Sequence, residues 1–178
     1  VARRFYRYYE DDYDFLIVRS ALELIGDAHG VHRRVRNDID GIGVEVFDNS
    51  SCCGHTRRLK GIMYINFSLM GATLHELAHQ WANRLESFAG SRGHWHYSDV
   101  DGILGGLSTQ IVDLGDDRFL MSANPEASAW CGKYAPLELY LMGLVPPAAV
   151  PPTRVLRGVE GVTYSAHEGG WVVSAESL

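Results

Sequence analysis

Hydrophobic residues alternate with polar ones, or gather in short apolar runs, over the first third of the chain. Glycine, aspartate and asparagine separate these stretches, and such residues are typical of turns between strands. The stretches with this pattern are residues 15–18, 31–36, 43–47 and 59–67. The pattern therefore predicts a strand-rich N-terminal part.

A helical period follows the last of these strands. Apolar residues recur every three or four positions from about residue 71 to 86, which is typical of an amphipathic helix. They are Leu74, Leu77, Ala78, Trp81, Ala82 and Leu85. Thr73 stands three residues before Glu76 and is suited to a capping box, although a start near Ser68 or Gly71 is equally compatible with the pattern.

The second half of the chain is less regular. Residues 87–120 are rich in glycine and aspartate, which predicts loops with short strands. A second helix is predicted for residues 135–144, where Pro136 is tolerated in the first turn. The tail, residues 155–178, is predicted to be a strand pair or the start of another module.

Length and composition indicate one globular domain over residues 1–178, and the predicted strands and helices indicate the α+β class. The chain is 46% hydrophobic and 21% charged, which is ordinary for a folded protein. We expect a strand-rich part with its helix over 1–86 and a loop-rich part over 87–178. The net charge of −6 argues against a nucleic-acid surface, and no apolar run approaches the length of a membrane span.

His75, Glu76 and His79 form an H-E-x-x-H motif inside the first predicted helix. Residues four apart leave the same face of a helix, so both imidazoles can bind one Zn²⁺. Glu76 then lies beside the metal, where it can act as general base towards an activated water. The alternative is a surface helix with two solvated histidines, but their large apolar neighbours disfavour it.

A catalytic zinc site needs a third protein ligand. We expect His94, which follows Gly93 and comes fifteen positions after His79, because a flexible glycine lets the loop fold back. His96 is an alternative in the same segment. Glu138 is another alternative, because a carboxylate in an apolar helix needs a cation or hydrogen-bond donors. A third interpretation is that Glu138 does not bind the metal but orients one of the zinc histidines.

The motif resembles that of the zincin metallopeptidases, specifically over residues 73–82 and only in architecture beyond them. SprT-like zincins have a third histidine after a glycine, similar to His94, and gluzincins have a glutamate on a later helix, similar to Glu138. The metzincin pattern is absent, because Ala82 and Leu85 stand where glycine and histidine are needed. The chain also looks similar to metallopeptidase domains of exported bacterial proteins.

This resemblance implies a zincin-like fold and a secreted or periplasmic zinc metalloendopeptidase. It also implies that a protein or peptide substrate binds extended along a sheet edge. His96, Tyr97 and Tyr140 are candidates to stabilise the oxyanion. Two alternatives remain: a binding or adhesion module with a structural zinc ion, and a zinc hydrolase of non-peptide amides or esters.

Two further signals are weaker. Asp99, Asp101 and Gly102 form a D-x-D-G fragment that could bind Ca²⁺, although a tight turn explains it better. The chain has three cysteines. One disulfide from Cys52 or Cys53 to Cys131 fits an exported protein, and buried free thiols are the alternative.

Overall fold

The computed structural model describes residues 1–21, 29–54, 56–66, 70–82, 85, 93–106, 111–124 and 132–177. Helices and strands are both present, which confirms the α+β class. Internal contacts divide the chain into two compact units, Val1–Gln80 and Trp81–Leu178. The single domain over 1–178 and the zincin-like arrangement stay predictions. Phe67, Ser68, Cys131 and most of residues 83–92 lie outside the described residues.

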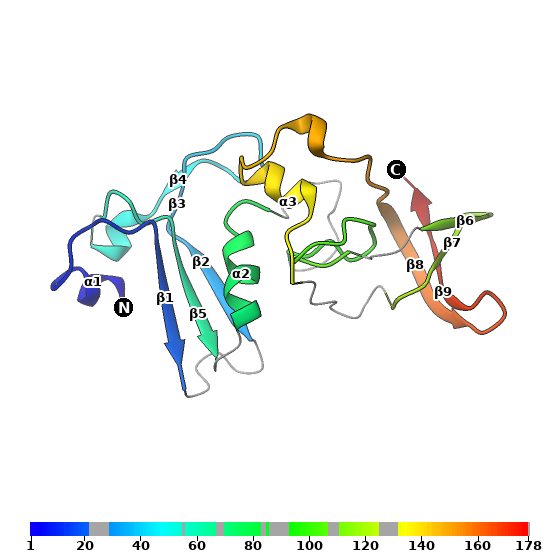
Figure 1. Ribbon diagram of the computed structural model, residues 1–178, viewed down its shortest axis with the longest axis horizontal. Helices are drawn as coiled ribbons and strands as arrows, with labels where there is room; N and C mark the ends of the chain where they lie inside the picture. The colour runs from blue at the N-terminus through cyan, green and yellow to red at the C-terminus, as the bar shows by residue number, and fades with distance from the viewer. Residues whose placement is uncertain are drawn as a thin grey trace. The chain divides into compact units, whose positions relative to one another are not determined.

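The N-terminal unit is built on a three-stranded sheet (Figure 1). Its strands are β1 (Phe15–Ser20), β2 (Gly30–Arg34) and β5 (Gly61–Asn66), in the order β1-β5-β2. β5 runs parallel to β1 and antiparallel to β2. Five of the six β5 residues are buried, as expected for a central strand of mostly apolar sequence. The predicted strand 15–18 is confirmed. The predicted strand 59–67 is confirmed over Gly61–Asn66, and Leu59 and Lys60 precede it.

The predicted strand 31–36 is interrupted at Val35. The Val35 side chain is buried, and the N–H groups of Val35 and Arg36 both donate to the carbonyl of Lys60, at 2.7 Å and 3.1 Å, which breaks the regular pairing. After this break, β3 (Arg36–Asn37) pairs with β4 (Phe47–Asp48) in a separate two-stranded ribbon.

The predicted strand 43–47 is wrong except for its last residue, because the segment before Phe47 bends around a buried amide. The Asn37 side chain, 2% exposed, donates Nδ2 to the carbonyls of Ile39, Val44 and Glu45 at 2.9–3.1 Å. These carbonyls are directed at one side chain and not at a neighbouring strand. A short helix, α1 (Ala2–Phe5), and a 3-10 turn, η1 (Ser50–Cys53), were not predicted from the sequence.

Helix α2 (Met70–Ala78) packs on the sheet beside β2 and β5 (Figure 1). Met63, Ile65 and Ala72 form the buried cluster at this contact, with Phe15 and Leu77 partly buried against it. The opposite face carries a second cluster, built from Ala2, Leu16, Val35, Leu59 and Ile62. The two-residue period of the strands thus separates two apolar layers.

Helix α2 begins at Met70 and ends at Ala78, earlier than the predicted end at residue 86. Thr73 therefore lies inside the helix and is not its cap. The end has a local cause: Gln80 N–H donates to the carbonyl of Leu77 at 3.1 Å, which tightens the last turn. The Gln80 side chain is directed at the sheet instead of continuing the apolar stripe.

The C-terminal unit contains a four-stranded antiparallel sheet (Figure 1). Its strands are β6 (Val112–Gly115), β7 (Arg118–Met121), β8 (Leu156–Ser165) and β9 (Gly170–Ser177), in the order β6-β7-β9-β8. Its buried cluster consists of Ile111, Phe119, Met121, Leu156, Val173 and Ala175. The strand pair predicted for the tail and the short strands before residue 120 are confirmed.

The second predicted helix is confirmed as α3 (Pro136–Leu141), with Pro136 in its first turn. It ends before residue 144 because Gly143 adopts a left-handed φ of 74°. A 3-10 turn, η3 (Pro147–Ala149), follows it. None of the described helices is long and apolar enough to cross a membrane.

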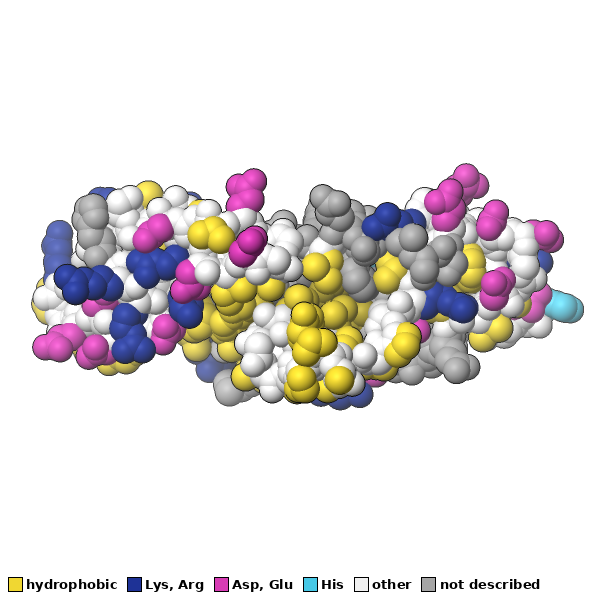
Figure 2. Space-filling view, turned by 90° about the horizontal axis from the view of Figure 1, so that it is seen from above, with side chains coloured by type: hydrophobic (Ala, Val, Ile, Leu, Met, Phe, Trp, Pro, Cys, Tyr) yellow, Lys and Arg dark blue, Asp and Glu magenta, His cyan; other side chains and the backbone are white. Residues whose placement is uncertain are grey.

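Basic and acidic side chains are interspersed on the N-terminal unit. Figure 2 shows dark blue and magenta side chains interspersed on one face of this unit. Two ion pairs belong to this surface, Arg36–Asp48 at 3.1 Å and Arg58–Asp14 at 3.4 Å. Both lie at least partly in solvent, so their contribution to stability is small.

Candidate metal centre

Helix α2 and the turn that ends it carry His75 and His79 four positions apart. Their rings are 5.0 Å apart between centroids and nearly perpendicular, at 82°. This is the same-face placement that the H-E-x-x-H spacing predicts.

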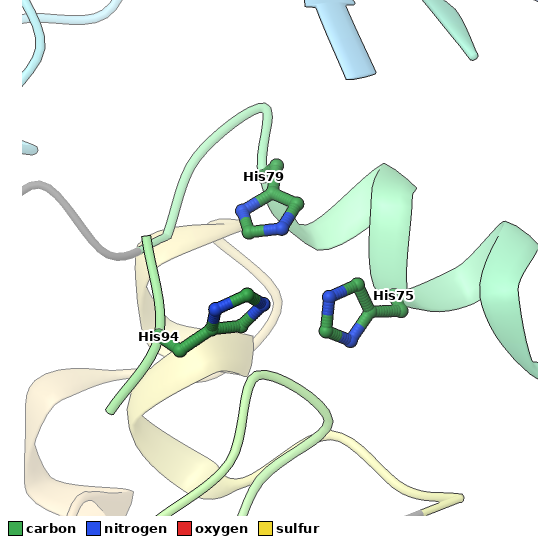
Figure 3. A group of neighbouring side chains, drawn as sticks. All are labelled: His75, His79 and His94. Carbon is green, nitrogen blue, oxygen red and sulfur yellow. The ribbon is translucent and has the colours of Figure 1, made fainter. Parts of the chain in front are cut away.

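His94 is the third member of the group. His75, His79 and His94 each offer one ring nitrogen, and these three atoms lie within 4.8 Å of one another. Figure 3 shows the three rings arranged around one point. All three side chains are half-buried, and Gly93 before His94 has a φ of 90°, which favours glycine. The structure thus brings together the three histidines that the sequence singled out.

The donor set is suited to zinc. Neutral imidazole binds Zn²⁺ well, and three protein ligands are the usual number in a catalytic site. Two nitrogens of a tetrahedral zinc site stand about 3.4 Å apart, and the three ring nitrogens here all lie within 4.8 Å of one another. Among the described residues, this is the one group of at least three histidine, cysteine or acidic side chains that could hold a metal ion.

Glu76 lies against strand β2 and is 6% exposed. A Cβ atom added at Gly30 would come within 2.6 Å of Glu76 Cγ and 2.8 Å of Oε1, so the carboxylate occupies the space that a side chain at Gly30 would fill. Burial raises the pKa of Glu76 to about 7, and a hydrogen bond from the His32 backbone opposes this rise. A carboxyl group with this pKa can accept and release a proton near neutral pH.

His32 and Gln80 form a buried polar link between β2 and the end of α2. His32 Nε2 lies 2.9 Å from Gln80 Oε1, and Gln80 Nε2 donates to the carbonyl of Arg36 at 2.8 Å. Because the amide nitrogen of Gln80 is already directed at Arg36, its oxygen faces the ring, and the ring proton sits on Nε2. A Cβ at Gly61 would come within 2.6 Å of His32 Cε1.

This link was not found from the sequence, where His32 had no assigned role. The available signal was the two-residue period of β2, which places Gly30, His32 and Arg34 on one face. The pKa of His32 is lowered to about 4, chiefly by burial and to a smaller extent by the charge of Arg34, while the Gln80 hydrogen bond and the Glu76 backbone act in the opposite direction. Nδ1 of this ring is buried without a hydrogen-bond partner among the described residues.

Glu138 is completely buried, and its carboxylate accepts four N–H hydrogen bonds. It does not belong to the histidine group, and neither does His96, whose ring lies 5.7 Å from that of His94. These facts favour His94 over both alternatives for the third ligand. Tyr97 packs against the core of the C-terminal sheet, and Tyr140 is 40% exposed.

The acidic fragment proposed for Ca²⁺ is occupied by protein contacts. Asp99 Oδ1 accepts a hydrogen bond from Arg154 N–H at 2.8 Å, and Asp101 pairs with Lys133 at 3.3 Å. Gly102 and Gly105 exchange backbone hydrogen bonds, which confirms a tight turn at this point.

The cysteines do not support the predicted disulfide. Cys52 and Cys53 both carry free thiols. Neither therefore forms the predicted bridge to Cys131, which lies outside the described residues. The secreted or periplasmic location stays a prediction.

No protein-family model, curated protein or solved structure matches this chain.

The pKa of His32 predicts how the stability of the metal-free protein depends on pH. Because the pKa is about 4 in the folded state and about 6.5 in an unfolded chain, the unfolded chain binds this proton more readily between these values. The stability that neutral His32 contributes is therefore present above pH 6.5 and is lost as the pH falls towards 4, by at most about 1.4 kcal/mol per pH unit.

Urea unfolding of the wild type and of His32→Leu at pH 7.5 and pH 5 measures this effect. We expect the unfolding free energy of the wild type, relative to that of His32→Leu, to be lower at pH 5 than at pH 7.5 by up to about 2 kcal/mol. His167→Leu, which removes an exposed histidine, is the matched control. A difference between wild type and His32→Leu that is independent of pH would contradict the assignment.

Proposed function

We propose that this protein is a zinc-dependent metallopeptidase of the zincin type. The observation that carries the proposal is the group of three ring nitrogens, from His75, His79 and His94, within 4.8 Å of one another. The sequence adjacency of Glu76 to His75 supplies the second functional group that hydrolysis needs. We propose His75, His79 and His94 as the zinc ligands.

When bound, a zinc ion acts as a Lewis acid that activates water and polarises a carbonyl oxygen. Glu76 accepts the proton of the water that attacks the scissile carbonyl. It then delivers this proton to the leaving amine as the C–N bond breaks and the new C–O bond remains in the product acid. The space beside Gly30 lets the carboxylate take up its position without displacing β2.

Strand β2 supports a peptide as the substrate. Among the described strands, it pairs with β5 alone, so one edge of its backbone is available for an added strand. An extended peptide can hydrogen-bond to such an edge, which gives affinity with little dependence on sequence. The same strand carries Gly30, against which Glu76 lies, so a peptide on this edge would run beside the general base.

The number of ligands favours a catalytic over a structural zinc. Structural zinc sites are closed by four protein ligands, whereas catalytic sites use three and leave a position for water. The group in the described residues has three members.

The substitution Glu76→Gln tests the role of the general base. The amide cannot take a proton from water, so we expect hydrolysis of a denatured protein substrate to fall by at least about a hundredfold, the lower range for general-base catalysis. Zinc content should stay at one ion per chain. Glu160→Gln, an exposed carboxylate on β8, should behave as wild type. Undiminished turnover by Glu76→Gln would refute this role, and a wild type that cleaves only small esters would refute the peptide substrate.

Gly30→Ala tests the same residue by steric means. The new methyl group would overlap the Glu76 side chain, whose Cγ lies 2.6 Å from the position of the added Cβ. We expect kcat to fall by about tenfold or more, because small displacements of a catalytic group are costly, while zinc stays bound. The matched control is Gly161→Ala in β8, where the added Cβ meets nothing within 4 Å. Equal kcat values for Gly30→Ala and Gly161→Ala would show that catalysis does not depend on the position of Glu76.

A further inference from the structure

The carboxylate of Glu138 is the centre of a buried hydrogen-bond network. Oε1 accepts from Trp95 Nε1 and Leu104 N–H, both at 2.9 Å. Oε2 accepts from Ile103 N–H at 3.0 Å and Ala135 N–H at 2.8 Å. A carboxylate has about four acceptor positions. All of them are used by N–H donors, which leaves none for a metal ion.

Two of the donors come from one tight turn that fits closely around Glu138. The turn is closed by hydrogen bonds between Gly102 and Gly105, at 2.8 Å and 3.1 Å, and it directs the N–H groups of Ile103 and Leu104 at the carboxylate. A Cβ at Gly102 would come within 2.5 Å of Cδ and both carboxylate oxygens. The φ of Gly102 lies outside the left-handed region, so it is this close approach that requires glycine.

The third donor, Trp95, is the residue directly after His94. It is 1% exposed and is held at three points. Its indole Nε1 binds Glu138, its backbone N–H donates to the carbonyl of Leu104 at 3.0 Å, and its carbonyl accepts from Ser98 Oγ at 2.6 Å. The chain can therefore move little immediately after His94.

From this geometry we infer that Glu138 positions His94 through Trp95 and the Gly102–Gly105 turn, without binding the metal itself. This inference rests on the proposed function, because it concerns the third zinc ligand. Removing an acceptor from this buried site would leave N–H groups without partners, which costs free energy and loosens the segment. A loosened segment holds the imidazole less firmly at ligand distance, so metal affinity falls.

Two variants disturb the network in different ways. Glu138→Gln replaces one oxygen with an amide group that faces N–H donors, and Gly102→Ala pushes the carboxylate aside. The matched control is Gly132→Ala, in the same unit, where the added Cβ meets nothing within 4 Å. The readouts are the Co²⁺ and Zn²⁺ affinities from chelator competition and the visible spectrum of the Co²⁺ form, at a temperature where circular dichroism shows a folded chain.

We expect Glu138→Gln and Gly102→Ala to bind one metal ion about 10–100-fold more weakly than wild type, the usual effect of losing a residue that supports a ligand. The Co²⁺ spectrum should keep the band positions of wild type, because the ligands are unchanged. Gly132→Ala should match wild type. Trp95→Phe keeps an aromatic ring and removes the indole N–H, and it should also bind the metal ion more weakly than wild type. This variant tests the inference if Glu138→Gln does not fold.

Wild-type affinity in folded Glu138→Gln or Trp95→Phe would overturn the inference, because the network would then serve stability alone. A Co²⁺ spectrum of Glu138→Gln that changes as that of His94→Ala does would overturn it as well, by making Glu138 a ligand. If wild type takes up no metal, both the inference and the proposed function fail. If wild type binds zinc and hydrolyses peptides while the variants are unaffected, only the inference fails.

Discussion

A side-chain nitrogen serves as a metal ligand only if the backbone that carries it is held in place. In this chain, a buried residue follows each candidate ligand. His75 is followed by Glu76, His79 by Gln80 and His94 by Trp95, with exposed fractions of 6%, 1% and 1%. Gln80 is bonded to His32 and to the Arg36 carbonyl, and Trp95 to Glu138 and its neighbours. We therefore infer that buried polar groups hold the segments that carry the imidazoles, as is usual for metal sites.

Three glycines make room for these buried polar groups. Added Cβ atoms at Gly30, Gly61 and Gly102 would come within 2.5–2.6 Å of the side chains of Glu76, His32 and Glu138 respectively. None of these glycines has a left-handed φ. Their common property is the absence of a side chain where a polar group approaches the backbone. Burial of such groups costs free energy unless hydrogen bonds compensate. At Glu138, four N–H donors provide this compensation.

Local sequence patterns predicted several of the strands and helices and the pairing of His75 with His79, because these depend on short spacings. The four-residue spacing of His75 and His79 and the apolar strands 15–18 and 59–67 are of this kind. The polar link between His32 and Gln80 and the network around Glu138 depend instead on hydrogen bonds between distant residues. His32 and Gln80 are 48 positions apart, and Trp95 and Glu138 are 43 apart. No periodic pattern in the sequence indicates such pairs. From the sequence alone, Glu138 could therefore be a metal ligand or an acceptor of hydrogen bonds, and its four N–H donors in the structure distinguish the two.

The central claim is that His75, His79 and His94 together hold one zinc ion. X-ray absorption at the zinc edge, combined with metal analysis of the purified and folded protein, tests it most directly. We predict one zinc per chain, with nitrogen ligands at about 2.0–2.1 Å and the scattering pattern of three imidazoles, and a loss of one imidazole in His94→Ala. A folded wild type that contains no transition metal and takes none up would contradict the claim, as would an unchanged imidazole count in His94→Ala.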